Sequence, residues 1–235
     1  MGYKSLLVHL DVGRSNDAPL QFTRELAGRF EARVIGITAS APPFVAYADV
    51  GVDGETFEME RGQIKEQIDA AESEFRAAFQ DGCANVEWRF SDDDADLVRY
   101  VFHQARNTDL VVTAVAQGDA FDSARALHTG ALVMQVGRPV LLVPLAARTA
   151  KLDRILVGWK DTRETRRAVA DALPLMRRAK VTVVEGGDLH AAADRERCDV
   201  LVAGAYGHSR VRESMLGGVT KDLLISPHRC SLVSH

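Results

Sequence analysis

The sequence predicts an α/β protein in which parallel strands alternate with helices, and three observations lead to this class. Short apolar runs alternate with amphipathic segments up to Leu145, which is the element order of a doubly wound parallel sheet. The same order restarts after Asp153, which indicates a second copy of the unit. Residues 200–224 then read as a buried strand, a glycine-marked loop and a helix, an arrangement that often binds anions.

The first copy supplies five apolar runs that are too short for helices and are expected to be strands. Amphipathic segments lie between them, and Asn16 is a plausible N-cap for the first of these. Val86, Trp88 and Phe90 alternate with other residues, so the third strand is expected at an edge of the sheet. The expected strands are residues 6–10, 33–38, 86–90, 109–116 and 139–144, and the expected helices are residues 16–32, 60–80, a segment from residue 97, and residues 123–136.

Two polar segments of the first copy leave alternatives open. Asp92, Asp93 and Asp94 stand together, as metal ligands do, but acidic residues are also favoured at the start of a helix by its dipole, and we prefer this second interpretation. The loop over residues 42–54 is long enough to contact a ligand or partner, although a simple surface loop is the preferred interpretation.

The second copy is a shortened version of the first. Residues 155–159 match residues 6–10, and 30 positions separate Asp109 from Pro139 as they separate Asp199 from Arg229. The first and fourth strand equivalents are 103 positions apart in the first copy but 44 in the second, so a loop, a helix and a strand have no counterpart. We therefore expect two tandem domains, residues 1–146 and 153–235. The second is expected to have strands at residues 155–159, 181–184, 200–203 and from 229, and helices at residues 162–179 and 189–197.

Four glycines mark the loop of the second copy, and their expected role is to hold an anion. Gly204 and Gly207 follow the strand, and Gly217 and Gly218 open the next helix. Backbone N–H groups at a helix start have no intrahelical partner, and glycines let the backbone approach a ligand closely. A phosphate group is therefore the expected ligand.

The spacing Gly204-x-x-Gly207, nine residues, then Gly217 resembles the nucleotide motif of the universal stress protein (UspA-type) family, Gly-x-x-Gly-x9-Gly-(Ser/Thr). Gly218 replaces the final hydroxyl residue of that motif. The resemblance implies Rossmann-like tandem domains with strand order 3-2-1-4-5, the second lacking its edge strand. It also implies a cytoplasmic stress-response protein that binds ATP or a related adenine nucleotide, with or without Mg²⁺, as a homodimer or an intramolecular domain pair.

The same resemblance assigns the site. The strand ends near Trp159 and Val184 would hold the adenosine. Lys160 stands where the first copy has Asp11, the counterpart of an acidic residue near the nucleotide in the family, and the first copy has no Gly-x-x-Gly after Ala114. The residues expected to cradle the phosphates are Gly204, Gly207, His208, Gly217, Gly218, Val219 and Thr220.

Composition and the remaining polar residues argue against a nucleic-acid or membrane partner, a cysteine metal site and an enzyme. A formal charge of −4 with interspersed signs argues against nucleic acid or an anionic membrane as partner. Cys83, Cys198 and Cys230 have no metal-ligand spacing, and His9 is expected to be a core histidine. Since no residue is designated as a general base, an enzyme is not predicted. A dimerisation scaffold of the same fold and a slow ATP hydrolase remain as alternatives to a nucleotide binder.

Overall fold

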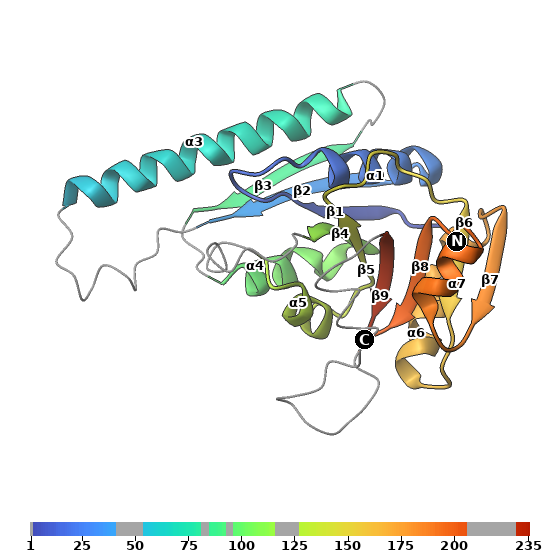
Figure 1. Ribbon diagram of the computed structural model, residues 1–235. Helices are drawn as coiled ribbons and strands as arrows, with labels where there is room; N and C mark the ends of the chain where they lie inside the picture. Colours follow the sequence, from blue (N-terminus) through green and yellow to red (C-terminus); the bar gives the residue numbers. More distant parts are fainter. Residues whose placement is uncertain (1, 41–53, 81–84, 93–95, 116–126, 206–228) are drawn as a thin grey trace.

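One nine-stranded sheet runs through the described part of the chain, with the order β3-β2-β1-β4-β5-β9-β8-β6-β7 (Figure 1). The computed structural model describes residues 2–40, 54–80, 85–92, 96–115, 127–205 and 229–235. Neighbouring strands are parallel except for β5 and β9, which pair antiparallel through Val140–Val233, Leu141–Leu232 and Leu142–Ser231. The α/β class and the mostly parallel sheet predicted from the sequence are confirmed.

The first copy contributes the strand order 3-2-1-4-5, as predicted. Its strands are apolar, and the three inner ones are buried along nearly their whole length, which is the pattern of a sheet covered on both faces. The elements are β1 (Ser5–His9), α1 (Asp17–Phe30), β2 (Arg33–Ala39), α3 (Gly54–Phe79), β3 (Val86–Ser91), α4 (Leu97–Gln104), the 3₁₀ turn η1 (Ala105–Asn107), β4 (Leu110–Val115), α5 (Thr129–Gln135) and β5 (Val140–Pro144).

The second copy contributes the order 2-1-4-5, counted from the edge inward. Among the described residues no strand lies beyond β7, so the predicted loss of the edge strand agrees with the structure. The elements are β6 (Arg154–Gly158), α6 (Arg163–Met176), β7 (Val181–Glu185), α7 (Leu189–Arg195), β8 (Val200–Gly204) and β9 (Cys230–Ser234).

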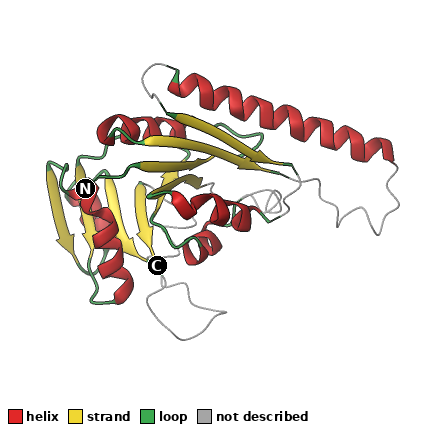
Figure 2. Ribbon diagram, turned by 180° about the vertical axis from the view of Figure 1, so that it is seen from behind, coloured by secondary structure: helices red, strands yellow, loops and turns green. Residues whose placement is uncertain are grey.

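The helices cover both faces of the sheet (Figure 2). One buried cluster joins α1, α3 and α6 to side chains such as Leu6, Val112 and Val202. The other joins α4, α5 and α7 to side chains such as Leu7 and Leu201. Each cluster contains residues of both copies, so the apolar core continues across the β5–β9 junction.

Several expected details differ in the structure. Asn16 occupies the N-cap position of α1, but its side chain makes no cap bond: its amide oxygen accepts from the Asp11 N–H at 2.8 Å, and its amide nitrogen donates to the Asp11 carbonyl. The N-cap of α4 is Asp96, whose carboxylate accepts from the Arg99 N–H at 3.0 Å, so Asp92 does not cap this helix. Asp93 and Asp94 lie outside the described residues.

Candidate functional site

The carboxyl ends of β6 and β8 form the candidate site because the order in which the strands are added to the sheet reverses between them. These strands are parallel neighbours, with Val157 in register with Val202. From β6 the chain crosses by α6 to the outer strand β7, whereas β9 lies on the other side of β8. Open parallel sheets bind ligands at such a switch point, in the crevice outside the strand ends.

Gly204 ends β8 and lies directly against the first turn of α6. A Cβ atom added at Gly204 would lie 2.4 Å from the Thr165 backbone nitrogen and 2.5 Å from the Glu164 carbonyl carbon. Both are backbone atoms, so no side chain could move away to make room. The absence of a Cβ at Gly204 therefore lets the start of α6 pack against the end of β8.

The first turn of α6 carries its own capping groups. The Thr162 hydroxyl accepts from the Thr165 N–H at 3.2 Å. Burial raises the pKa of the Glu164 carboxyl, but a hydrogen bond from its own N–H, the Arg163 charge and the Thr162 hydroxyl outweigh burial, so this pKa lies below its usual range. Glu164 is therefore a buried carboxylate that contributes negative charge beside Gly204.

Gly204 is the one predicted phosphate-binding residue that falls within the described part of the chain. The other predicted site residues, Gly207, His208, Gly217, Gly218, Val219 and Thr220, lie outside the described residues. Their grouping around a phosphate stays a prediction.

Trp159 and Val184, the residues expected to hold adenosine, line a common apolar hollow. Its volume is about 300 Å³, and Val157, Val169 and Met176 complete its lining. Trp159 and Val184 are 42% and 59% exposed, which is unusual for such large apolar side chains at strand ends. The hollow is thus open to solvent.

The end of the first strand, β1, carries a polar cluster in the first copy. His9 is 2% exposed and its Nδ1 lies 3.3 Å from the Thr113 hydroxyl and 3.8 Å from an Asp11 carboxylate oxygen. Burial lowers the pKa of His9, against the opposing effect of Asp11. The prediction that His9 is a satisfied core histidine is confirmed.

Ser234 was not predicted to belong to the site, yet it is in register with Gly204 at the end of β9. Its hydroxyl is buried and has no hydrogen-bond partner among the described residues. No local sequence signal marks this serine, because only the pairing of β8 with β9 brings it to the crevice.

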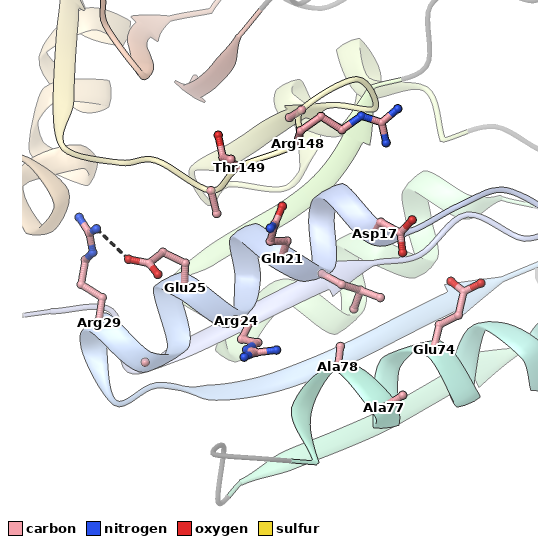
Figure 3. A pocket seen from close by; sticks show the side chains of 14 residues that line it. Asp17, Gln21, Arg24, Glu25, Arg29, Glu74, Ala77, Ala78, Arg148 and Thr149 are labelled. Atoms are coloured by element: carbon pink, nitrogen blue, oxygen red, sulfur yellow. Dashed lines mark hydrogen bonds and ion pairs between the residues drawn. The ribbon is translucent and has the colours of Figure 1, made fainter.

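A larger groove lies elsewhere, between α1, the carboxyl-terminal half of α3 and residues 147–150 (Figure 3). Its volume is about 1120 Å³, and basic side chains such as Arg24 and Arg148 alternate with acidic ones such as Glu25 and Glu74. Arg29 is paired with Glu25 at 2.8 Å. Because no predicted site residue lines this groove, we assign it no ligand.

The described part of the chain contains neither a candidate metal site nor a helix that could span a membrane. No group of three or more His, Cys, Asp or Glu side chains there is arranged to hold a metal ion. No described helix has the length and apolar character needed to cross a bilayer. Cys198 and Cys230 are buried free thiols, and Cys83 lies outside the described residues.

Comparison with solved structures shows the same fold in universal stress proteins. A universal stress protein from Archaeoglobus fulgidus DSM 4304 superimposes with a TM-score of 0.72 at 12% identity, over 98% of this chain and 95% of that one. A functionally unknown protein from Pseudomonas aeruginosa PAO1 gives a TM-score of 0.64 at 15% identity, over 99% and 92% of the two chains. Neither a protein-family model nor a curated protein sequence matches this chain. The predicted structural resemblance to universal stress proteins is confirmed.

Proposed function

We propose that this chain is a tandem universal stress protein that binds ATP or a related adenine nucleotide in its second copy. It would act in the stress response of the cytoplasm. The observation that carries the proposal is the switch point between β6 and β8, where the glycine motif begins at Gly204. In this proposal the phosphates lie against the backbone of residues 204–220, with or without Mg²⁺.

The apolar hollow beside Trp159 and Val184 supports the adenosine part of the proposal. An adenine ring needs an apolar surface with few polar contacts, and the exposed Trp159 indole offers one for stacking. The buried Ser234 hydroxyl provides a hydrogen-bonding group at the same edge of the sheet, and no described residue bonds to it.

A scaffold without nucleotide is the second candidate, and the first turn of α6 favours it. Gly204 is already packed against this turn, and the Glu164 carboxylate would repel a phosphate placed beside it. Gly218 also favours the scaffold, because it replaces the hydroxyl residue with which the motif ends. A scaffold would retain the fold and use it for protein association.

Calorimetric titration with ATP and with AMP, each with and without Mg²⁺, separates the two candidates. We expect saturable heat at one site per chain and a rise in melting temperature, since a ligand that binds the folded state stabilises it. Phosphate release measured in parallel tests the slow hydrolase, for which no described residue is a candidate base.

The matched variants are Gly207→Val and Gly28→Val. A Cβ at Gly28 meets no atom within 4 Å, so Gly28→Val should bind like the unmodified protein, whereas Gly207→Val should lose binding about tenfold or more. No heat and no thermal shift at millimolar nucleotide would favour the scaffold.

A further inference from the structure

Strand β7 forms one outer edge of the sheet, and no described strand pairs with its outer side. Both views of the molecule show it at the end of the sheet, opposite β3 (Figures 1 and 2). Strands β5 and β9 are paired with each other inside the chain. Of the described strands, only β3 and β7 therefore leave an edge at which the sheet can extend.

The backbone of β7 directs hydrogen-bonding groups away from the sheet. The Val181 N–H donates to the Asp153 carbonyl at 3.2 Å, and the Glu185 carbonyl accepts from the Trp159 N–H at 2.7 Å, so residues 181 and 185 face β6. Successive residues of a strand direct their backbone groups to opposite sides. The N–H and C=O groups of Thr182 and Val184 therefore point outward.

The two edges differ in the features that prevent strand pairing. On β3, Glu87 and Arg89 form an ion pair at 2.8 Å, and such charges disfavour an added strand. The run Val181, Thr182, Val183 and Val184 in β7 has no charged residue and no proline. An uncharged, β-branched edge strand of this kind is a template for another strand.

We propose that β7 is a dimer interface in which two copies of this chain pair through antiparallel β7 strands centred on Val183. This register places Thr182 opposite Val184 of the partner subunit, and Val184 opposite Thr182 of the partner subunit. Each opposed pair exchanges two backbone hydrogen bonds, so the outward groups of all four residues are satisfied.

A second copy suits this edge because antiparallel pairing of β7 with another β7 is symmetric about Val183. A two-fold axis through Val183 brings identical surfaces together, as in most homodimers. Glu185 comes opposite Val181 of the partner subunit, so no like charges face one another. β-branched residues directly opposite one another also stabilise antiparallel strands. Since a short strand pair buries little area, we expect a concentration-dependent dimer.

Sedimentation velocity from low micromolar to near-millimolar protein tests the proposal. The unmodified chain should change from monomer to dimer, while amide hydrogen exchange at Thr182 and Val184 slows. Thr182→Pro removes an outward N–H that β6 does not use, so the fold should persist. The dimer loses two hydrogen bonds, and its dissociation constant should rise about 10- to 100-fold.

Two further variants distinguish an interface on β7 from one on β3. Thr182→Lys places a charge on the edge without changing the backbone and should also weaken the dimer. Phe90→Lys, at a 54% exposed position on β3, should leave the dimer intact. A monomer at every concentration would overturn the proposal and leave the edge for a strand of another protein. A dimer lost in Phe90→Lys but kept in both Thr182 variants would place the interface on β3 and overturn it equally.

Discussion

At the scale of single residues, the two copies repeat one device at the start of their first strands. The Asp109 carboxylate accepts from the N–H groups of Lys4 and Ser5 at 2.7 and 3.0 Å. The Asp199 carboxylate accepts from the two residues before Ile155, at 3.1 and 2.9 Å. The matching runs in the sequence therefore preserve a hydrogen-bonding role as well as an apolar pattern.

Replacing either aspartate should destabilise the fold to a similar extent. Asp109→Ala or Asp199→Ala removes the acceptor of two N–H groups, and each variant should lose about 1–3 kcal/mol of unfolding free energy in total, since hydrogen bonds to charged groups contribute on this order. Urea unfolding measures this, with Asp188→Ala as a milder control, because the two N–H groups from which Asp188 accepts at the start of α7 are exposed. A change below the error of the measurement in both variants would contradict the shared role.

His9 should make the stability depend on pH. Burial lowers its pKa from 6.5, so the unfolded chain binds a proton that the folded chain does not. The stabilisation is complete above about pH 6.5 and is lost as the pH falls below it, by up to about 1.4 kcal/mol per pH unit. Urea unfolding of the protein and of His9→Gln between pH 7 and 5 measures this slope. An equal pH dependence of the unfolding free energy in the two proteins would contradict this role of His9.

At the scale of elements, the second copy has no counterpart of α3, and a strand residue that α3 covers in the first copy is exposed in the second. Gly36 of β2 lies beneath α3, where an added Cβ would meet the rings of Phe75 at 2.7 Å and Trp88 at 2.8 Å. Counted from the start of each strand, the equivalent residue of β7 is Val184, which is 59% exposed. The second copy thus carries a larger side chain where the first has a covering helix.

Gly36→Val should therefore be destabilising, by about 1–3 kcal/mol, because it forces α3 away from β2. Gly28→Ala, at a position on α1 with open space, should instead stabilise by about 0.5–1 kcal/mol. Thermal unfolding compares the two variants. An unchanged melting temperature in Gly36→Val would mean that α3 does not press on this strand.

Element type could be predicted from the sequence because it depends on local apolar patterns and on the repeat, whereas the strand order was implied by the resemblance of the glycine motif to the universal stress protein family. The starts of α1, α6 and α7 lie where the sequence predicts them. The capping bonds of α1 and α4 could not be predicted, since the Asn16 side chain is used by the Asp11 loop and Asp96 caps α4. Within the site, Trp159 could be anticipated from its place after a strand. Ser234 and the packing of Gly204 could not, because both depend on contacts between distant segments.

At the scale of the whole molecule, several contacts join the shortened second copy to the first. The Tyr3 hydroxyl donates to the Asp171 carbonyl at 2.7 Å, and Arg29 lies 3.2 Å from both the Leu152 carbonyl and the Asp153 carboxylate. The Arg178 guanidinium lies 4.8 Å from the centre of the Phe30 ring. Together with the β5–β9 pair, these contacts hold the two copies in one body.

The two proposed domains, residues 1–146 and 153–235, should consequently differ in whether they fold when expressed alone. Expressed alone, residues 153–235 should show no cooperative urea transition, because the short unit loses the shared core and one neighbour of β9. Residues 1–146 alone should unfold cooperatively. Circular dichroism during urea titration measures both, and a cooperative transition in the isolated second domain would contradict this dependence.

The proposed nucleotide site is the crevice between β6 and β8, and the direct test is a crystal structure from crystals grown with ATP and Mg²⁺. We predict the adenine ring in the hollow beside Trp159 and Val184, and the phosphates against backbone N–H groups of residues 204–220. A structure in which those N–H groups bond to the chain itself, with no nucleotide at millimolar ATP, would contradict the account.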